Sequence, residues 1–110
     1  MKKSLAAASL AVLACAGGIA AASPASAAGW ATIRSNSGGA WLRAQPSTSA
    51  YGMEYLGNGT SVLMMCYVDA QWATGNYSSN RWFKVEPAYD PAVGYVHSSL
   101  VANQVGVPRC

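Results

Sequence analysis

The sequence is poor in charged residues and in residues that bind metal ions. Its 110 residues include seven Lys and Arg, four Asp and Glu, and one histidine, His97. A metal site at His97 would need carboxylates, and the four acidic residues are scattered without ligand spacing. There is also no glycosidase-like carboxylate pair and no glycine-rich loop to cradle a phosphate. We therefore expect no metal ion and no cofactor.

The longest uncharged segment lies at the N-terminus. Two lysines precede an apolar, alanine-rich run over residues 5–22, and residues 25–27 (Ala-Ser-Ala) form a small-x-small cleavage site. This pattern predicts a secretory signal peptide at residues 1–27, followed by one domain at residues 28–110. The run is too short and too rich in alanine to predict a spanning helix. An alternative takes Cys15 as a lipoprotein acylation site, which would associate the product with a membrane.

Positive charge becomes scarce once the expected signal peptide is set aside. Two of the seven basic residues, Lys2 and Lys3, lie in it, so five basic residues face four acidic ones, for a net charge of +1. No basic stripe remains that could neutralise a series of phosphates. We expect no nucleic-acid partner.

Cysteine is also sparse, with only Cys66 and Cys110 in the expected domain. Two cysteines in an exported domain most simply form one disulfide. The bridge would span 110 − 66 = 44 residues, and the chain-entropy model gives roughly 4 kcal/mol for such a loop. The alternative pairs Cys66 with His97 as nucleophile and base of a thiol hydrolase. Cys66 lies in an apolar run that lacks the cationic neighbours that activate a thiol.

Period-two alternation of apolar and polar residues predicts an all-β fold. Near the C-terminus, Arg81–Glu86 and Val93–His97 read as an antiparallel hairpin, with prolines in the connection. A short helical turn is expected at residues 98–100, after which Val101 resumes a strand. Earlier strands are expected at Trp30–Arg34, Ala40–Arg43, Glu54–Leu56 and Thr60–Val68.

Turn-forming residues separate these strands. Ser35–Gly39 is expected to be a turn, and Asn58-Gly59 is the strongest two-residue hairpin signal. Asp69–Asn80 is expected to be a polar loop, in which Trp72 either folds back as a lid or contacts a ligand. Five or six short antiparallel strands with one disulfide describe a small β-barrel.

Four blocks of the sequence occur in the order found in a known family. They are Trp41–Ser49 (W-L-R-A-Q-P-S-T-S), Leu56–Val62 (L-G-N-G-T-S-V), Trp82–Val85 (W-F-K-V) and Gly94–Leu100 (G-Y-V-H-S-S-L). Together they resemble the bacterial SH3-type domain of secreted and cell-envelope proteins. Two departures from the family are Ala-Gln in place of Ser-Gly before the first proline, and the length of the segment at 69–80. The resemblance implies an SH3-like barrel and a non-catalytic module that binds cell-wall peptide.

Strand parity divides the C-terminal hairpin into two faces. Large apolar side chains at Phe83, Val85 and Val96 are expected in the core, which places their sequence neighbours on the opposite face. We expect an aromatic, peptide-binding surface there, because flat aromatic side chains suit extended peptides. The alternative is that these side chains only pack against loops and cover the strands. Tyr55 is a candidate beside Tyr51, and the expected ligand-binding residues are Trp82, Tyr95, His97, Tyr51 and Trp72.

The sequence thus predicts a secreted or cell-wall-associated binding module that is not an enzyme. The expected ligand is cell-wall (peptidoglycan) peptide, and we expect a monomer without stable membrane association unless Cys15 is acylated. The second interpretation is a small secreted protein-interaction module or inhibitor, whose partner is an extracellular protein. The third is the thiol hydrolase with Cys66 and His97.

Overall fold

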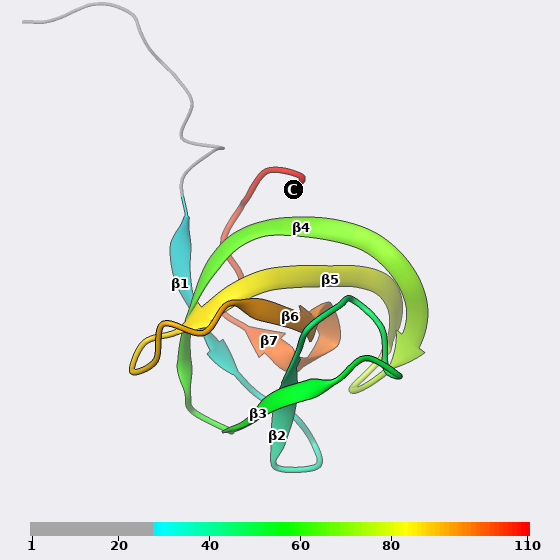
Figure 1. Ribbon diagram of the computed structural model, residues 1–110, viewed down its shortest axis with the longest axis horizontal. Helices are drawn as coiled ribbons and strands as arrows, with labels where there is room; N and C mark the ends of the chain where they lie inside the picture. The colour runs from blue at the N-terminus through cyan, green and yellow to red at the C-terminus, as the bar shows by residue number, and fades with distance from the viewer. Residues whose placement is uncertain (1–27) are drawn as a thin grey trace, which may run out of the picture.

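The computed structural model describes residues 28–110, and the expected signal peptide at residues 1–27 lies outside them. The described chain forms one seven-stranded antiparallel sheet that curls into a half-barrel (Figure 1). This confirms the expected all-β fold, in which the short segment after the last turn adds a seventh strand. No helix within residues 28–110 is long and apolar enough to cross a membrane. The elements are β1 (Gly29–Ile33), β2 (Gly39–Arg43), β3 (Gly52–Gly57), β4 (Ser61–Thr74), β5 (Ser78–Pro87), β6 (Gly94–His97), the 3-10 turn η3 (Ser98–Leu100) and β7 (Val101–Ala102).

The sheet order is β3-β2-β6-β5-β4-β1-β7. Hairpins join β2 to β3, β4 to β5 and β5 to β6, and β1 lies between β4 and β7. Figure 1 shows β4 and β5 as two long, curved strands that arch over the shorter ones. The β4–β5 hairpin therefore forms one whole side of the half-barrel.

The loop expected at Asp69–Asn80 is wrong, because this segment is the end of the β4–β5 hairpin. Only residues 75–77 lie between the two strands. The paired positions Asp69↔Arg81 and Ala73↔Ser79 are 73 − 69 = 4 residues apart along β4 but only 81 − 79 = 2 residues apart along β5. Two extra residues in one strand form a bulge that bends the pair. The bulge interrupts the period-two pattern, which is why the sequence pattern indicated a loop.

The core lies on the inner face of the curled sheet. Phe83, Val85 and Val96 are buried as expected. They pack with apolar side chains from the other strands, so a continuous layer of Ile, Leu, Val and Met fills the half-barrel. The other large members of this layer are Ile33, Leu42, Leu56, Val62 and Met64.

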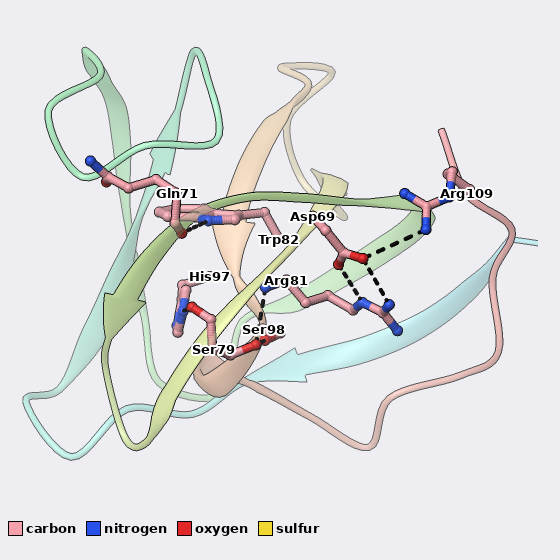
Figure 2. Close-up of polar contacts among 8 residues, drawn as sticks. All are labelled: Asp69, Gln71, Ser79, Arg81, Trp82, His97, Ser98 and Arg109. Atoms are coloured by element: carbon pink, nitrogen blue, oxygen red, sulfur yellow. Dashed lines mark hydrogen bonds and ion pairs between the residues drawn. The ribbon is translucent and has the colours of Figure 1, made fainter.

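The disulfide between Cys66 and Cys110 is confirmed, and it ties the C-terminal segment to β4 with a Cα–Cα distance of 4.9 Å. The Tyr67 amide donates to the Pro108 carbonyl at 2.9 Å, and the Cys110 amide donates to the Tyr67 carbonyl at 2.8 Å. Arg109 extends this attachment, because its guanidinium lies 3.6 Å from the Asp69 carboxylate (Figure 2). The last residues of the chain are thus held beside β4 by covalent, backbone and ionic contacts.

Turns lie at Ser35–Gly39 and Asn58-Gly59 as expected, but the second turn does not close the hairpin that its sequence predicted, because β3 pairs with β2 and β4 pairs with β5 and β1. Residues 58–59 form the turn between β3 and β4, with Gly59 at φ +93°, a conformation that favours glycine. The Asn58 side chain accepts from the Ser35 amide at 2.7 Å and donates to the Ser35 carbonyl at 2.8 Å. This pair of hydrogen bonds fixes the start of the turn between β1 and β2.

Candidate functional site

A groove of about 480 Å³ opens between β2 and the tip of the β4–β5 hairpin. Side chains of β5 and β6 make its floor. Side chains of β2, β3 and the hairpin tip make its walls. The turn before β2 completes the rim. We call this hollow the aromatic groove, and its main lining residues are Trp41, Arg43, Tyr55, Asn76, Trp82 and His97.

The floor consists of Trp82 and His97, which are cross-strand partners on β5 and β6. Their rings meet edge to face, with centroids 5.1 Å apart and an interplanar angle of 78°. The expectation that both side chains lie on an exposed surface is wrong, because Trp82 is 1% exposed and His97 is 4% exposed. The Trp82 indole donates to the Gln71 carbonyl in the β4 bulge at 2.8 Å (Figure 2). Both residues still line the groove from below.

His97 uses both ring nitrogens inside the protein. Nε2 lies 2.8 Å from the Ser79 carbonyl oxygen, and Nδ1 lies 2.8 Å from Ser99 Oγ. A carbonyl oxygen only accepts, so Nε2 carries a proton, and in the neutral imidazole Nδ1 then accepts from the Ser99 hydroxyl. The imidazole therefore joins β5 to η3 beneath the groove.

Asn76 holds the tip of the hairpin at the rim. Its Nδ2 donates to the carbonyls of Arg34 (2.9 Å) and Ser99 (3.0 Å), and its Oδ1 accepts from the Asn36 amide at 2.9 Å. Its backbone amide donates to Ser99 Oγ at 3.1 Å. Ser99 thus connects the rim, through Asn76, to His97 in the floor, so the groove is a preformed feature of the fold.

Trp41 and Tyr55 form an aromatic wall. They are cross-strand partners on β2 and β3, with ring centroids 5.3 Å apart at 69°. Trp41 is 45% exposed and Tyr55 is 48% exposed. Gly52 makes room for the indole, because a Cβ there would lie 2.7 Å from Trp41 Cε3. The wall therefore offers aromatic surface that is held in place and open to solvent.

Of the residues that the structure describes, Arg43 is the one charged residue that lines the aromatic groove. It is half-buried, and its Nη1 donates to the Ala50 carbonyl at 3.0 Å. Strand alternation places it on the same face as Trp41, because the intervening Leu42 is fully buried. The groove thus combines an aromatic wall with a single positive charge.

Three residues predicted to bind ligand lie outside the lining of the groove. Tyr95 is the cross-strand partner of both Arg43 and Lys84, and its side chain does not line the groove. Tyr51 is 75% exposed ahead of β3, and Trp72 is 69% exposed on β4. Trp72 therefore does not fold back as a lid. Ligand contact by these three residues stays a prediction.

Sequence reasoning named Tyr55 as a candidate but missed Trp41, the other side chain of the wall, and Arg43, the charge of the groove. Trp41 and Arg43 flank Leu42, and the same parity argument used for the C-terminal hairpin would have placed them on one outer face. Asn76 carries no comparable signal, because an asparagine before Tyr-Ser-Ser indicates only a turn. Its role depends on contacts with residues 34, 36 and 99, which are far away in the sequence.

A second hollow, also of about 480 Å³, lies over the outer face of β1, β4 and β5. Trp30 and Tyr89 line it together with the carboxylates of Glu86 and Asp90. The Tyr89 hydroxyl donates to Glu54 at 2.7 Å, and this hydrogen bond raises the pKa of Tyr89 above 10.0. The two hollows therefore differ in the sign of the charges that line them.

Among residues 28–110, no three His, Cys, Asp or Glu side chains form a group that could hold a metal ion.

No family model, curated protein or solved structure matches this chain.

Proposed function

We propose that this chain is a secreted, non-catalytic binding module of the SH3-like kind, and that it recognises cell-wall peptide. The observation that carries the proposal is the aromatic groove, which is preformed and lined by Trp41, Tyr55, Trp82 and His97. Its volume of about 480 Å³ falls in the range of small-ligand sites, roughly 300–1,000 Å³.

An extended peptide suits this groove better than a compact ligand. Trp41 and Tyr55 offer flat apolar surface on one wall, and the rim presents small, mostly polar residues at 35–37 and 74–76. Aromatic-lined grooves are a common way to recognise peptides in extended conformation. The small polar rim supplies hydrogen-bonding groups for the peptide backbone.

Binding without catalysis is favoured by the state of the two residues that a thiol hydrolase would need. Cys66 is bonded to Cys110, so it is not a free nucleophile. Both nitrogens of His97 are engaged, with Ser79 and Ser99. The disulfide also supports export, since such bonds persist mainly in oxidising compartments.

A sedimentation assay with purified bacterial cell-wall sacculi tests the proposal. We expect the protein to be retained on sacculi, and Trp41→Ala to weaken retention by about tenfold or more, as for a central aromatic contact. The matched control is Trp30→Ala, because Trp30 is similarly exposed (58%) but lines the second hollow. Absence of retention would contradict the proposal and leave the extracellular-protein partner as the better candidate. Equal losses for the two variants would exclude the aromatic groove as the binding site.

A further inference from the structure

We propose that the aromatic groove selects a peptide that bears a free carboxylate, with Arg43 as its counter-ion. This inference rests on the proposed peptide-binding function and adds the charge of the ligand and the residue that recognises it.

The distribution of charge carries the inference. Among residues 28–110, Arg43 is the only charged residue that lines the groove, and no Asp or Glu of this range lines it. Within residues 28–110, the only carboxylate within 4.0 Å of a basic side chain is Asp69, which pairs with Arg81 and Arg109. Two other carboxylates, Glu86 and Asp90, line the second hollow. The positive charge in the groove therefore has no internal counter-ion in the described part of the chain.

The guanidinium of Arg43 has donors to spare. It has five N–H groups arranged in a planar fork, and its intramolecular hydrogen bond is from Nη1 to the Ala50 carbonyl. A carboxylate matches this fork with two parallel hydrogen bonds. Because Arg43 is half-buried, such a pair is screened less by water than a fully exposed pair.

The position of Arg43 also fixes where the carboxylate lies relative to the aromatic wall. Trp41 and Arg43 are two residues apart on one face of β2, which corresponds to about 7 Å along a strand. An extended peptide has the same repeat, so a ligand residue on the Trp41 indole would place a carboxylate about two residues away at Arg43. One arginine matches a singly charged carboxylate, whereas a polyanion would require a row of cations.

The experiment compares native sacculi with sacculi whose carboxylates have been converted to amides by carbodiimide and ammonia. We expect retention of the protein to fall roughly ten- to a hundredfold on amidated sacculi, the range for a lost charge-assisted pair. Arg43→Gln, which keeps an N–H donor for Ala50, should bind native sacculi as weakly and should no longer respond to amidation. The matched control is Arg34→Gln, which removes one exposed positive charge outside the groove lining and should behave as the parent protein does.

The outcomes separate this inference from the proposed function. Equal retention on native and amidated sacculi would overturn the carboxylate inference and leave peptide binding intact. Equal losses for Arg43→Gln and Arg34→Gln would overturn it as well, because general surface charge would then be the cause. No retention on either preparation would overturn the proposed function itself. The amidation comparison uses the parent protein, so it does not depend on how any variant folds.

Discussion

The indole N–H of Trp82 donates a hydrogen bond to the backbone carbonyl of Gln71, with an N···O distance of 2.8 Å. Gln71 lies in the β4 bulge, where the ladder with β5 is interrupted. A bulge leaves backbone groups without a strand partner, and the indole supplies one. The same side chain forms the floor of the aromatic groove, so the bulge, the floor and the shape of the groove depend on one another.

Trp82 is therefore predicted to be important for stability. Trp82→Ala should lower the free energy of unfolding by about 3–5 kcal/mol, as for large buried aromatic residues. Trp82→Phe should cost less, roughly 1–3 kcal/mol for the lost donor. Urea unfolding monitored by circular dichroism measures both. The control is Trp72→Ala, which removes a 69% exposed indole and should change stability by about 0.5 kcal/mol at most.

Trp82 also marks the limit of what the sequence could predict. Period-two alternation correctly placed Phe83 and Val85 in the core and Trp82 on the opposite face of β5. It could not indicate that Trp82 is buried, because the indole is bonded to a bulge at Gln71, eleven residues earlier in the sequence. Register shifts arise from tertiary packing, and a local pattern does not encode them.

The strands and turns were more predictable than the groove. Asn58-Gly59 correctly predicted a turn, because Gly59 adopts a positive φ, which is a local requirement. The predicted hairpin is wrong, because the strands on either side of this turn are not neighbours in the sheet. The Cys66–Cys110 bridge followed from counting, since no other pairing exists in the expected domain. The aromatic groove brings together β2, β5, β6 and the hairpin tip, and such long-range assembly was accessible only in part, through the parity of Trp82 and His97.

The disulfide is predicted to supply a large share of the stability. It closes a loop with a sequence separation of 44 residues, worth roughly 4 kcal/mol in the chain-entropy model. Reduction should therefore lower the thermal midpoint of the parent protein strongly. The double variant Cys66→Ala, Cys110→Ala should start at the lower midpoint and should not respond to reductant. An unchanged midpoint in the parent protein would mean that the contacts of Tyr67 with the C-terminal segment suffice.

Acid should destabilise the protein through Asp69. The hydrogen bonds from Arg81 hold the pKa of Asp69 below its ordinary value of 3.8, against an opposing effect of burial, and the charges of Arg81 and Arg109 add to the lowering. Because the pKa is lower in the folded state, the stabilisation is present above pH 3.8 and is lost as pH falls through the folded-state pKa. Asp69→Asn should therefore flatten the dependence of stability on pH below about pH 4.

Unfolding midpoints measured from pH 2 to pH 6 test this expectation. The matched control is Glu86→Gln, which removes a carboxylate that forms no salt bridge within residues 28–110. It should retain the acid sensitivity of the parent protein in the region attributed to Asp69. Parallel curves for Asp69→Asn and the parent protein would show that the ion pairs with Arg81 and Arg109 are too well solvated to matter.

Asn76 is predicted to control the order of the groove rim. Asn76→Ala removes the side-chain hydrogen bonds to Arg34, Asn36 and Ser99. Water can replace part of them, because two of the three bonds are exposed, so we expect a loss of about 1–2 kcal/mol.

The larger effect should be local, since the hairpin tip then loses its attachment to the turn before β2. Hydrogen exchange should accelerate at residues 74–78 and at the Asn36 amide, while the amides of β5 keep their protection. Asn80→Ala, a change in the same hairpin, is the control and should leave these rates unaltered. If exchange at the tip is unchanged in Asn76→Ala, then the β4–β5 ladder alone fixes the rim, and the groove would keep its shape without the link from Asn76 through Ser99 to His97.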